Sequence, residues 1–120
     1  MAQLTGRGEF FINSIKMATI AGGSVDAGGE VRETVRGQFG PLGYKVVDVA
    51  PGAVEIEIAH SADVDIRNDL DVTDATVIGI MDTGTTFLIV NATRVGDPLT
   101  LNVESGTISA RYEGKVAEII

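Results

Sequence analysis

The sequence contains no cysteine and no tryptophan among its 120 residues. Without cysteine, the chain cannot form disulfides, thiolate metal sites or a cysteine nucleophile. No apolar run approaches the roughly 18 residues that a membrane-spanning helix needs, so membrane insertion is not expected. The first residues lack a basic stretch followed by an apolar run, so no secretory leader is expected there.

Basic residues are scarce as well. Nine Lys and Arg stand against seventeen Asp and Glu, which gives a formal net charge of −8. Neutralisation of phosphates by Lys and Arg supplies most of the non-specific affinity for nucleic acids, so this balance argues against a protein that grips DNA or RNA. The acidic excess would serve solubility, and it would equally suit a passage that DNA crosses without binding.

The chain is rich in short β-prone segments separated by glycine and other turn residues. The clearest strand covers residues 53–59, where apolar side chains alternate with Glu55 and Glu57, which predicts one packed and one open face. Three antiparallel hairpins are predicted: residues 9–13 with 16–20, residues 75–81 with 86–91, and residues 99–104 with 107–113. A last strand is expected after Gly114.

One helix is predicted, over residues 60–71. Ser61 or Asp63 would cap it. The apolar side chains form a loose stripe that would pack on a sheet, and they are Val64, Ile66, Leu70 and Val72. Together the elements predict a mainly β protein: one domain over residues 1–120, an antiparallel β-sandwich or barrel-like fold of about seven or eight strands, with one short flanking helix.

Residues 21–43 differ in character from the rest of the chain. They are rich in glycine, and only residues 30–36 resemble a strand, so a long glycine-rich loop is predicted. Long loops are costly to order and are usually functional in a small domain. In a subunit that assembles, such a loop would be the arm that folds against a neighbouring copy.

Asp82-Thr83-Gly84 follows two apolar residues and resembles the active-site loop of aspartic proteases, whose retroviral members are small homodimers. The apolar-apolar-glycine segment that braces the active site of those enzymes is absent from the short remainder of the chain. A hairpin turn that needs Asp and Gly explains the motif better. A homodimeric protease that uses Asp82 is therefore kept only as a remote alternative.

The other candidate metal-binding, catalytic and phosphate-binding motifs do not match the patterns that those sites require. The aspartates between residues 63 and 74 do not fit a calcium loop, because Asn68 stands where glycine is needed and Asp74 where glutamate is needed. These aspartates are interpreted as a solvated helix face. His60, the only histidine, lacks partners for a zinc site or a catalytic triad and is interpreted as a surface residue at a strand end. The glycine spacing after residue 36 matches no phosphate loop. No cofactor and no enzymatic activity are predicted.

Several short motifs, in their order and spacing, resemble the tail-tube proteins of contractile-tailed bacteriophages, in particular the short Mu-like group. The motifs are Gly8 with Phe10–Asn13, Val54–Ile58, Asp74–Val77, Asp82–Phe87, Asn91-Ala92, Gly106–Ile108 and Tyr112–Gly114. The sequence departs from the pattern at Asn13-Ser14, where Asn-Gly is expected, and in the residues that follow Gly114.

The resemblance implies a structural virion protein that forms hexameric rings, whose inner strands merge into one barrel around a channel. The rings would stack into the inner tail tube, which conducts DNA during ejection. The implied partners are further copies of the chain, the sheath, the tape-measure protein, the baseplate, the tail terminator and passing DNA without specific binding. The implied location is the virion tail, assembled in the cytoplasm of the bacterial host.

Two sets of residues are predicted to serve this assembly. Candidate acids facing the channel are Glu55, Glu57 and Asp82. Candidates for contact between rings, within the loop at residues 21–43, are Gly28, Gly29, Val31, Arg32, Val35 and Phe39. An alternative is another component with the same fold, such as a terminator or a hub-adjacent protein of a phage tail, a bacteriocin or a contractile secretion machine.

Overall fold

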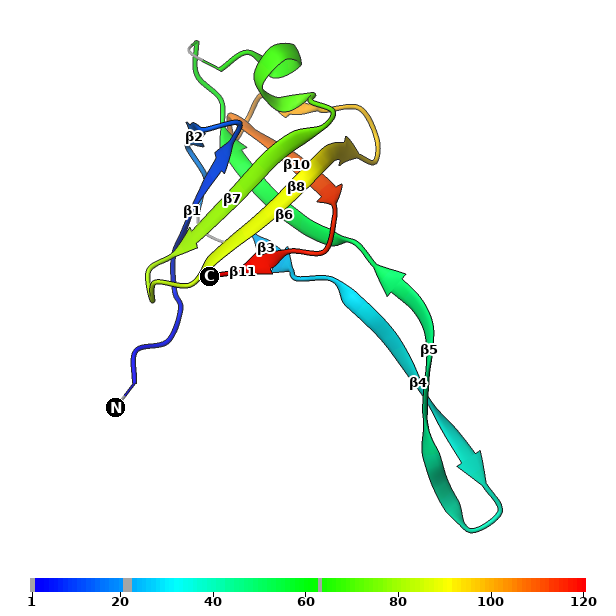
Figure 1. Ribbon diagram of the computed structural model, residues 1–120. Coiled ribbons are helices and arrows are strands. Elements are labelled where there is room, and N and C mark those ends of the chain that lie inside the picture. The colour runs from blue at the N-terminus through cyan, green and yellow to red at the C-terminus, as the bar shows by residue number, and fades with distance from the viewer. Residues whose placement is uncertain (1, 21–22, 63) are drawn as a thin grey trace.

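The computed structural model describes residues 2–20, 23–62 and 64–120, which form eleven strands and one helical turn. Figure 1 shows a rounded body from which two long strands extend as an arm. The strands are β1 (Gly8–Ile12), β2 (Ile15–Met17), β3 (Ser24–Asp26), β4 (Gly29–Gly37), β5 (Gly40–Ala50), β6 (Gly52–Ala59), β7 (Ala75–Met81), β8 (Thr86–Val95), β9 (Leu101–Asn102), β10 (Thr107–Gly114) and β11 (Glu118–Ile119). The helical turn, η1, covers Ile66–Leu70.

The body is one antiparallel sheet that curls into a barrel. Its strands follow the order β2-β1-β7-β8-β10-β6-β3, and β9 and β11 add to β10 and β8. The chain after β2 then pairs with β6, because Ile20 N donates to Glu57 O at 2.8 Å and Ala59 N donates to Ala18 O at 2.8 Å. The two ends of the strand path therefore meet, and the predicted mainly β, antiparallel, barrel-like fold is confirmed.

The core lies inside this barrel. Val54, Ile56 and Ile58 are each at most 2% exposed, whereas Glu55 and Glu57 between them are exposed. Buried residues of β10 stand directly opposite in the register, with Ile108 beside Ile58, Ala110 beside Ile56 and Tyr112 beside Val54. The alternation read from residues 53–59 is thus confirmed, because strand geometry sends successive side chains to opposite faces.

The three predicted hairpins are confirmed. The first turns at Asn13 and Ser14, which both adopt positive φ angles of 50° and 68°. That conformation belongs to the two-residue turn that joins twisted strands and normally favours Asn-Gly. The third hairpin is shorter than expected, because β9 contains only Leu101–Asn102.

The helix predicted over residues 60–71 is reduced to the single turn η1. Asp71 N donates to Ile66 O at 2.9 Å, five residues back, as in a π-helix. The cap is Asp65, whose carboxylate accepts from Arg67 N at 3.0 Å and Asn68 N at 3.1 Å. Ser61 as the cap was therefore wrong, because Asp65 starts the helix later, and Asp63 lies outside the described residues. The hydrogen bond from Asn68 N lowers the pKa of the Asp65 carboxyl.

The apolar stripe predicted for this helix is confirmed. Leu70 is fully buried, and the partly buried residues that pack against the core include Val64, Ile66 and Val72. Because one helical turn has almost no stability of its own, this packing and the cap hold it in place.

The long loop predicted at residues 21–43 was wrong. Residues 29–50 form a hairpin of β4 and β5, and the strand expected at residues 30–36 lies within β4. The glycines here lie at the turn and beside an irregularity, since Gly37 pairs with Gly40 at the tip and Gly43 directly follows a shift in register. The β-branched residues between the glycines extend the strands. Ala21 and Gly22, at the start of the predicted loop, lie outside the described residues.

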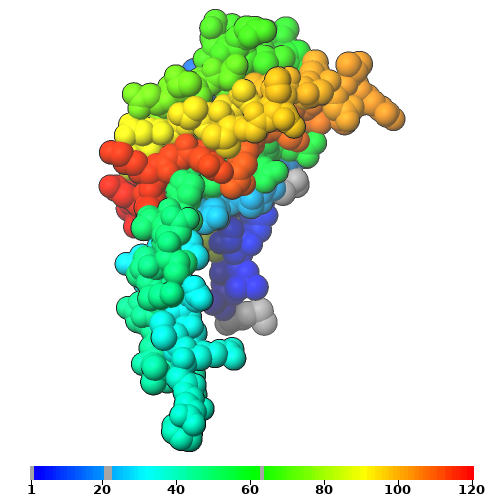
Figure 2. Space-filling model, turned by 90° about the vertical axis from the view of Figure 1, so that its right-hand side faces the viewer, coloured from blue at the N-terminus to red at the C-terminus, as the bar shows by residue number. Residues whose placement is uncertain are grey.

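The arm gives the molecule an elongated shape. It stands clear of the body in two perpendicular views (Figure 1 and Figure 2). The principal extents are 62 × 39 × 27 Å, and the radius of gyration is 17.3 Å. A compact domain of this length would have a radius of gyration of about 14 Å. The arm therefore contributes little to the core of its own chain.

Candidate assembly surface

The arm, defined as residues 29–50, has many exposed apolar side chains. Eight of the sixteen large apolar residues exposed in the described chain lie on it, and Phe39 at its tip is 97% exposed. They are Val31, Val35, Phe39, Leu42, Tyr44, Val46, Val47 and Val49. Isolated two-stranded hairpins are marginally stable in water, and contiguous apolar surface of this kind marks an interaction site.

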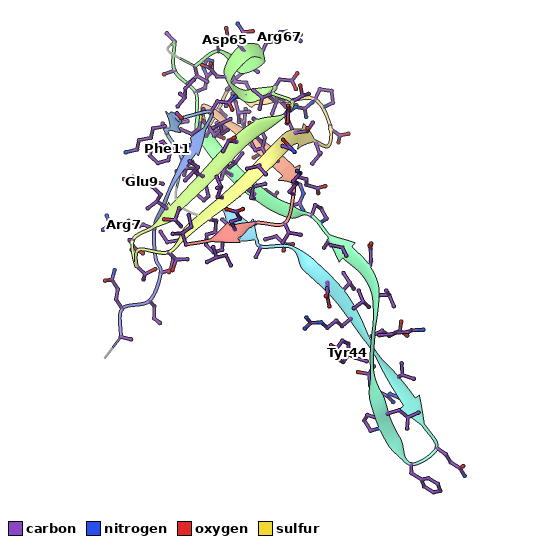
Figure 3. The ribbon with its side chains drawn as sticks, in the orientation of Figure 1. Arg7, Glu9, Phe11, Tyr44, Asp65 and Arg67 are labelled. Carbon is purple, nitrogen blue, oxygen red and sulfur yellow. The ribbon has the colours of Figure 1, made fainter. Side chains whose placement is uncertain are left out.

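All six residues predicted for contact between copies lie on the arm or at its root. Val31, Arg32 and Val35 belong to β4, Phe39 is at the tip, and Gly28 and Gly29 are at the root. Figure 3 shows side chains standing out from the arm into solvent, with Tyr44 labelled. The guanidinium of Arg32 lies 5.5 Å from the centre of the Tyr44 ring, which stiffens the arm locally.

The root of the arm is packed tightly against the body. β3 leads into β4, and β5 leads into β6, so the arm continues two paired strands of the barrel. Gly28 has a φ of +75°, and a Cβ there would lie 2.7 Å from backbone atoms of Pro51 and Gly52. Ala117 N also donates to Ala27 O at 2.9 Å. These contacts fix the direction in which the arm leaves the body.

The outward face of β6 and β10 is polar. Arg111 bridges two acids, with Nη1 3.4 Å from Glu55 Oε2 and Nε 3.0 Å from Glu113 Oε1. Glu57 lies two residues from Glu55 on the same face, beside Ser109 of β10. A groove of about 500 Å³ runs between this face and residues 95–102. The structure thus brings Glu55 and Glu57 together on an open surface.

Asp82 lies apart from these two glutamates, in the turn between β7 and β8. Its carboxylate accepts from Gly6 N at 3.2 Å, and its backbone N donates to Arg7 O at 3.0 Å. The hydroxyls of Thr5 and Thr83 are 2.7 Å apart. The turn therefore holds the segment before β1, and the interpretation of Asp82 as a hairpin-turn residue is confirmed.

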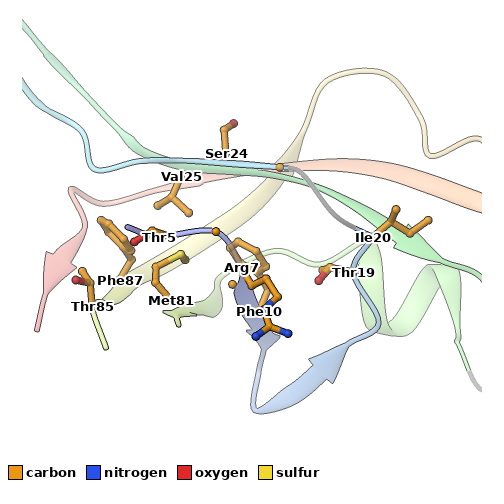
Figure 4. Close-up of a pocket in the computed structure, with 13 residues that line it drawn as sticks. Thr5, Arg7, Phe10, Thr19, Ile20, Ser24, Val25, Met81, Thr85 and Phe87 are labelled. Atoms are coloured by element: carbon orange, nitrogen blue, oxygen red, sulfur yellow. The ribbon is translucent and has the colours of Figure 1, made fainter. Parts of the chain in front are cut away.

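A cavity of about 660 Å³ opens near the root of the arm, between the two sides of the barrel. Figure 4 shows Phe10, Met81 and Phe87 on one side and Val25 on the other. Arg7 is the one charged side chain among the residues that line it in the described chain. Such a lining offers apolar contact and no acid–base pair.

His60 follows β6 and is exposed, as predicted. No helix in the described residues is long and apolar enough to cross a membrane.

A barrel with a complete core and an arm of exposed apolar residues is the architecture of a building block for an assembly. The family model for phage tail tube proteins matches residues 1–118, and the chain belongs to this family. The protein is accordingly a structural component of a tail tube and not an enzyme, so the protease alternative based on Asp82 was wrong.

Solved structures with a similar fold come from contractile injection machines. A chain of the cryo-EM structure of the anti-feeding prophage cap, which terminates the tube, has a TM-score of 0.70 at 10% identity, covering 100% of this chain and 91% of that chain. A chain of the structure of the PVC sheath/tube terminator, from an extracellular contractile injection system in its extended state, has a TM-score of 0.70 at 9% identity, covering 100% of this chain and 97% of that chain. A chain of the PVC sheath–tube complex has a TM-score of 0.66 at 10% identity, covering 96% and 88%. None of the curated proteins matches the sequence.

Sequence reasoning missed the second half of the arm, residues 44–50. The signal was present, because Tyr44 and Val46 alternate with Lys45, but the alternation is interrupted at Val47, where the register shifts. An interrupted alternation of β-prone residues next to glycine is easily read as the end of a loop.

Proposed function

We propose that the protein forms hexameric rings that stack into the inner tail tube and conduct DNA during ejection. The observation that carries this proposal is the arm, which leaves half of the large exposed apolar residues of the described chain without a partner. Burying them against another copy would supply the main driving force for association, because apolar burial is favourable in proportion to area.

A contact between the arm of one copy and a different surface of the next is heterologous. Repeated along an axis, it produces an open filament without a defined end. Contacts within a ring are proposed at open strand edges. In the described residues, β3 pairs only with β6 and β11 only with β8, so each has an edge available to a neighbour.

The outward face of β3, β6 and β10 is proposed to line the channel, with Glu55 and Glu57 among its acids. The arm grows directly out of β3 and β6, so the sheet that continues into the next ring is the one that carries these residues. Asp82 is proposed at one end of the channel wall. An acidic wall repels phosphates, so DNA passes without binding.

The proposed partners are the sheath outside the tube, the tape-measure protein and then DNA inside it, and the baseplate and the tail terminator at its ends. Assembly is proposed in the cytoplasm of the bacterial host, within the tail of a contractile virion. The arm at residues 29–50 takes the role proposed for contact between rings.

A terminator, or a hub-adjacent component of a phage tail, a bacteriocin or a contractile secretion machine, is the second candidate. Two of the similar chains come from structures of a tube-terminating cap and of a sheath/tube terminator, with TM-scores of 0.70, and one comes from a sheath–tube complex, with a TM-score of 0.66. A terminator caps one end, so it would form single rings where a tube protein forms long tubes.

Negative-stain electron microscopy of the purified protein tests the proposal. Wild-type protein is expected to form hollow tubes with hexameric rings, and single rings would favour the terminator. Replacing residues 32–47 with Asn-Gly joins Val31 to Asp48, which are paired, through a two-residue turn. This variant is expected to keep the melting temperature of the body and to form no tubes. Tubes of normal length from the shortened chain would contradict the role of the arm.

A further inference from the structure

The tip of the arm and the turn η1 lie at opposite ends of the molecule. Figure 1 and Figure 2 both place the arm below the body and the residues around η1 at the far end of the body. In Figure 3, Asp65 and Arg67 are labelled at that far end, and Tyr44 on the arm. In a head-to-tail stack, the arm of one copy therefore meets the η1 end of the next.

The distal arm, defined as residues 32–46 beyond the register shift, is basic. It holds Arg32, Arg36 and Lys45 against Glu33 alone, a formal charge of +2. Arg32 is engaged with Glu30 at 3.1 Å and with the Tyr44 ring. None of the ion pairs in the described chain includes Arg36 or Lys45. This positive charge is unusual in a chain whose net charge is −8.

The opposite end of the body is acidic. The acidic end, defined as residues 64–74 and 94–106, holds six acidic and two basic residues, a formal charge of −4. One of the two bases, Arg94, is engaged by Asp71, with Nε 2.7 Å from Oδ1. Asp97 and Glu104 are exposed, and Val103, which precedes Glu104 in the chain, is 88% exposed. The acidic end thus offers free carboxylates next to an apolar side chain.

We infer that the acidic end of a second copy of this chain is the surface that receives the distal arm. The inference rests on the proposed stacking and names the two faces that meet. Opposite charges at the two ends of one molecule attract in a head-to-tail stack and repel when like ends meet. The apolar residues of the arm supply the affinity, and the charges set the direction of stacking and the pairing of surfaces.

Charge reversal tests the pairing. The arm variant is Arg36→Glu with Lys45→Glu, and the end variant is Asp97→Lys with Glu104→Lys. All four side chains are exposed, and circular dichroism checks that each body folds. Each variant alone is expected to form tubes about tenfold less readily, measured as the protein concentration needed for tubes to sediment. An equal mixture of the two is expected to recover tubes, because reversed arms then meet reversed ends.

A matched control carries the same added charge elsewhere: Glu9→Lys with Glu118→Lys, both exposed and outside the acidic end. The control forms tubes by itself, and it is expected to leave the arm variant in the supernatant when the two are mixed. The inference is overturned if the arm variant and the end variant fail to rescue each other, if the control carries the arm variant into the sedimenting tubes as well as the end variant does, or if the arm variant assembles like wild type. Absence of tubes from wild-type protein would instead contradict the proposed function.

Discussion

At the scale of the residue, Tyr112 connects strand β10 to the turn η1. Its ring is fully buried, and its hydroxyl donates to Leu70 O at 2.7 Å, which ties β10 to the last residue of η1. Burial raises the pKa of the Tyr112 phenol above its usual value of 10.0. The hydroxyl thus remains a hydrogen-bond donor at pH values where an exposed tyrosine has begun to ionise.

Replacing Tyr112 with Phe is expected to lower the free energy of unfolding by about 1–2 kcal/mol, because the buried carbonyl of Leu70 loses its partner. Denaturant unfolding followed by circular dichroism measures this loss. Tyr44→Phe, on the exposed arm, is the matched control and leaves the stability of the body unchanged. In wild type, stability is also expected to fall as the pH rises above 10, because the unfolded phenol loses its proton first. Equal effects of the two substitutions would contradict this role.

Ser14 adopts a backbone conformation that a serine side chain disfavours. Its φ of 68° places a residue with a Cβ in the left-handed region. Ser14→Gly is expected to stabilise the protein by roughly 0.5–1 kcal/mol, measured by thermal unfolding. Asn13→Gly is the contrast, because the Asn13 side chain accepts from Thr76 N at 3.1 Å and that bond would be lost. The prediction fails if Ser14→Gly lowers the melting temperature.

At the scale of the element, the direction of the arm depends on the contacts at its root. Residues 26–28 pass close to the chain between β5 and β6, and Asp26 Oδ1 accepts from Gly28 N at 3.0 Å. A side chain at residue 28 would meet backbone atoms and not a movable side chain. Since backbone cannot give way cheaply, the direction of the arm is set at this point.

Gly28→Ala is therefore expected to lower the free energy of unfolding by about 1–3 kcal/mol. It is also expected to reduce tube formation, because the arm would leave the body in a different direction. Gly29→Ala is the control that has a positive φ without a steric clash, because Gly29 has a φ of +124° but nothing lies within 4 Å of an added Cβ. It is expected to cost less and to preserve tubes. Chemical denaturation and electron microscopy of the two variants give the comparison, and equal losses would show that the close approach at Gly28 is unimportant.

At the scale of the whole molecule, the proposed channel wall makes a prediction about DNA. Glu55→Lys with Glu57→Lys reverses two exposed charges on the outward face of β6 and frees Arg111 from Glu55. If that face lines the channel, passing DNA would bind, and DNA delivery by assembled particles is expected to fall. Glu9→Lys with Glu118→Lys adds the same charge on other strands and serves as the control. Unchanged delivery by otherwise intact particles carrying the first pair would count against a channel role for these glutamates.

The sequence by itself determined the mainly β antiparallel class, the inward face of β6, the three hairpins and the stripe that packs η1. Each follows from contacts between near neighbours or from the period-two alternation of a strand, which the order of residues expresses directly. Tertiary structure alone decided that residues 29–50 leave the body as an arm and that the basic and acidic ends lie opposite each other. Those features depend on where β3 and β6 sit in the barrel, and long-range strand pairing leaves no local signal in the sequence.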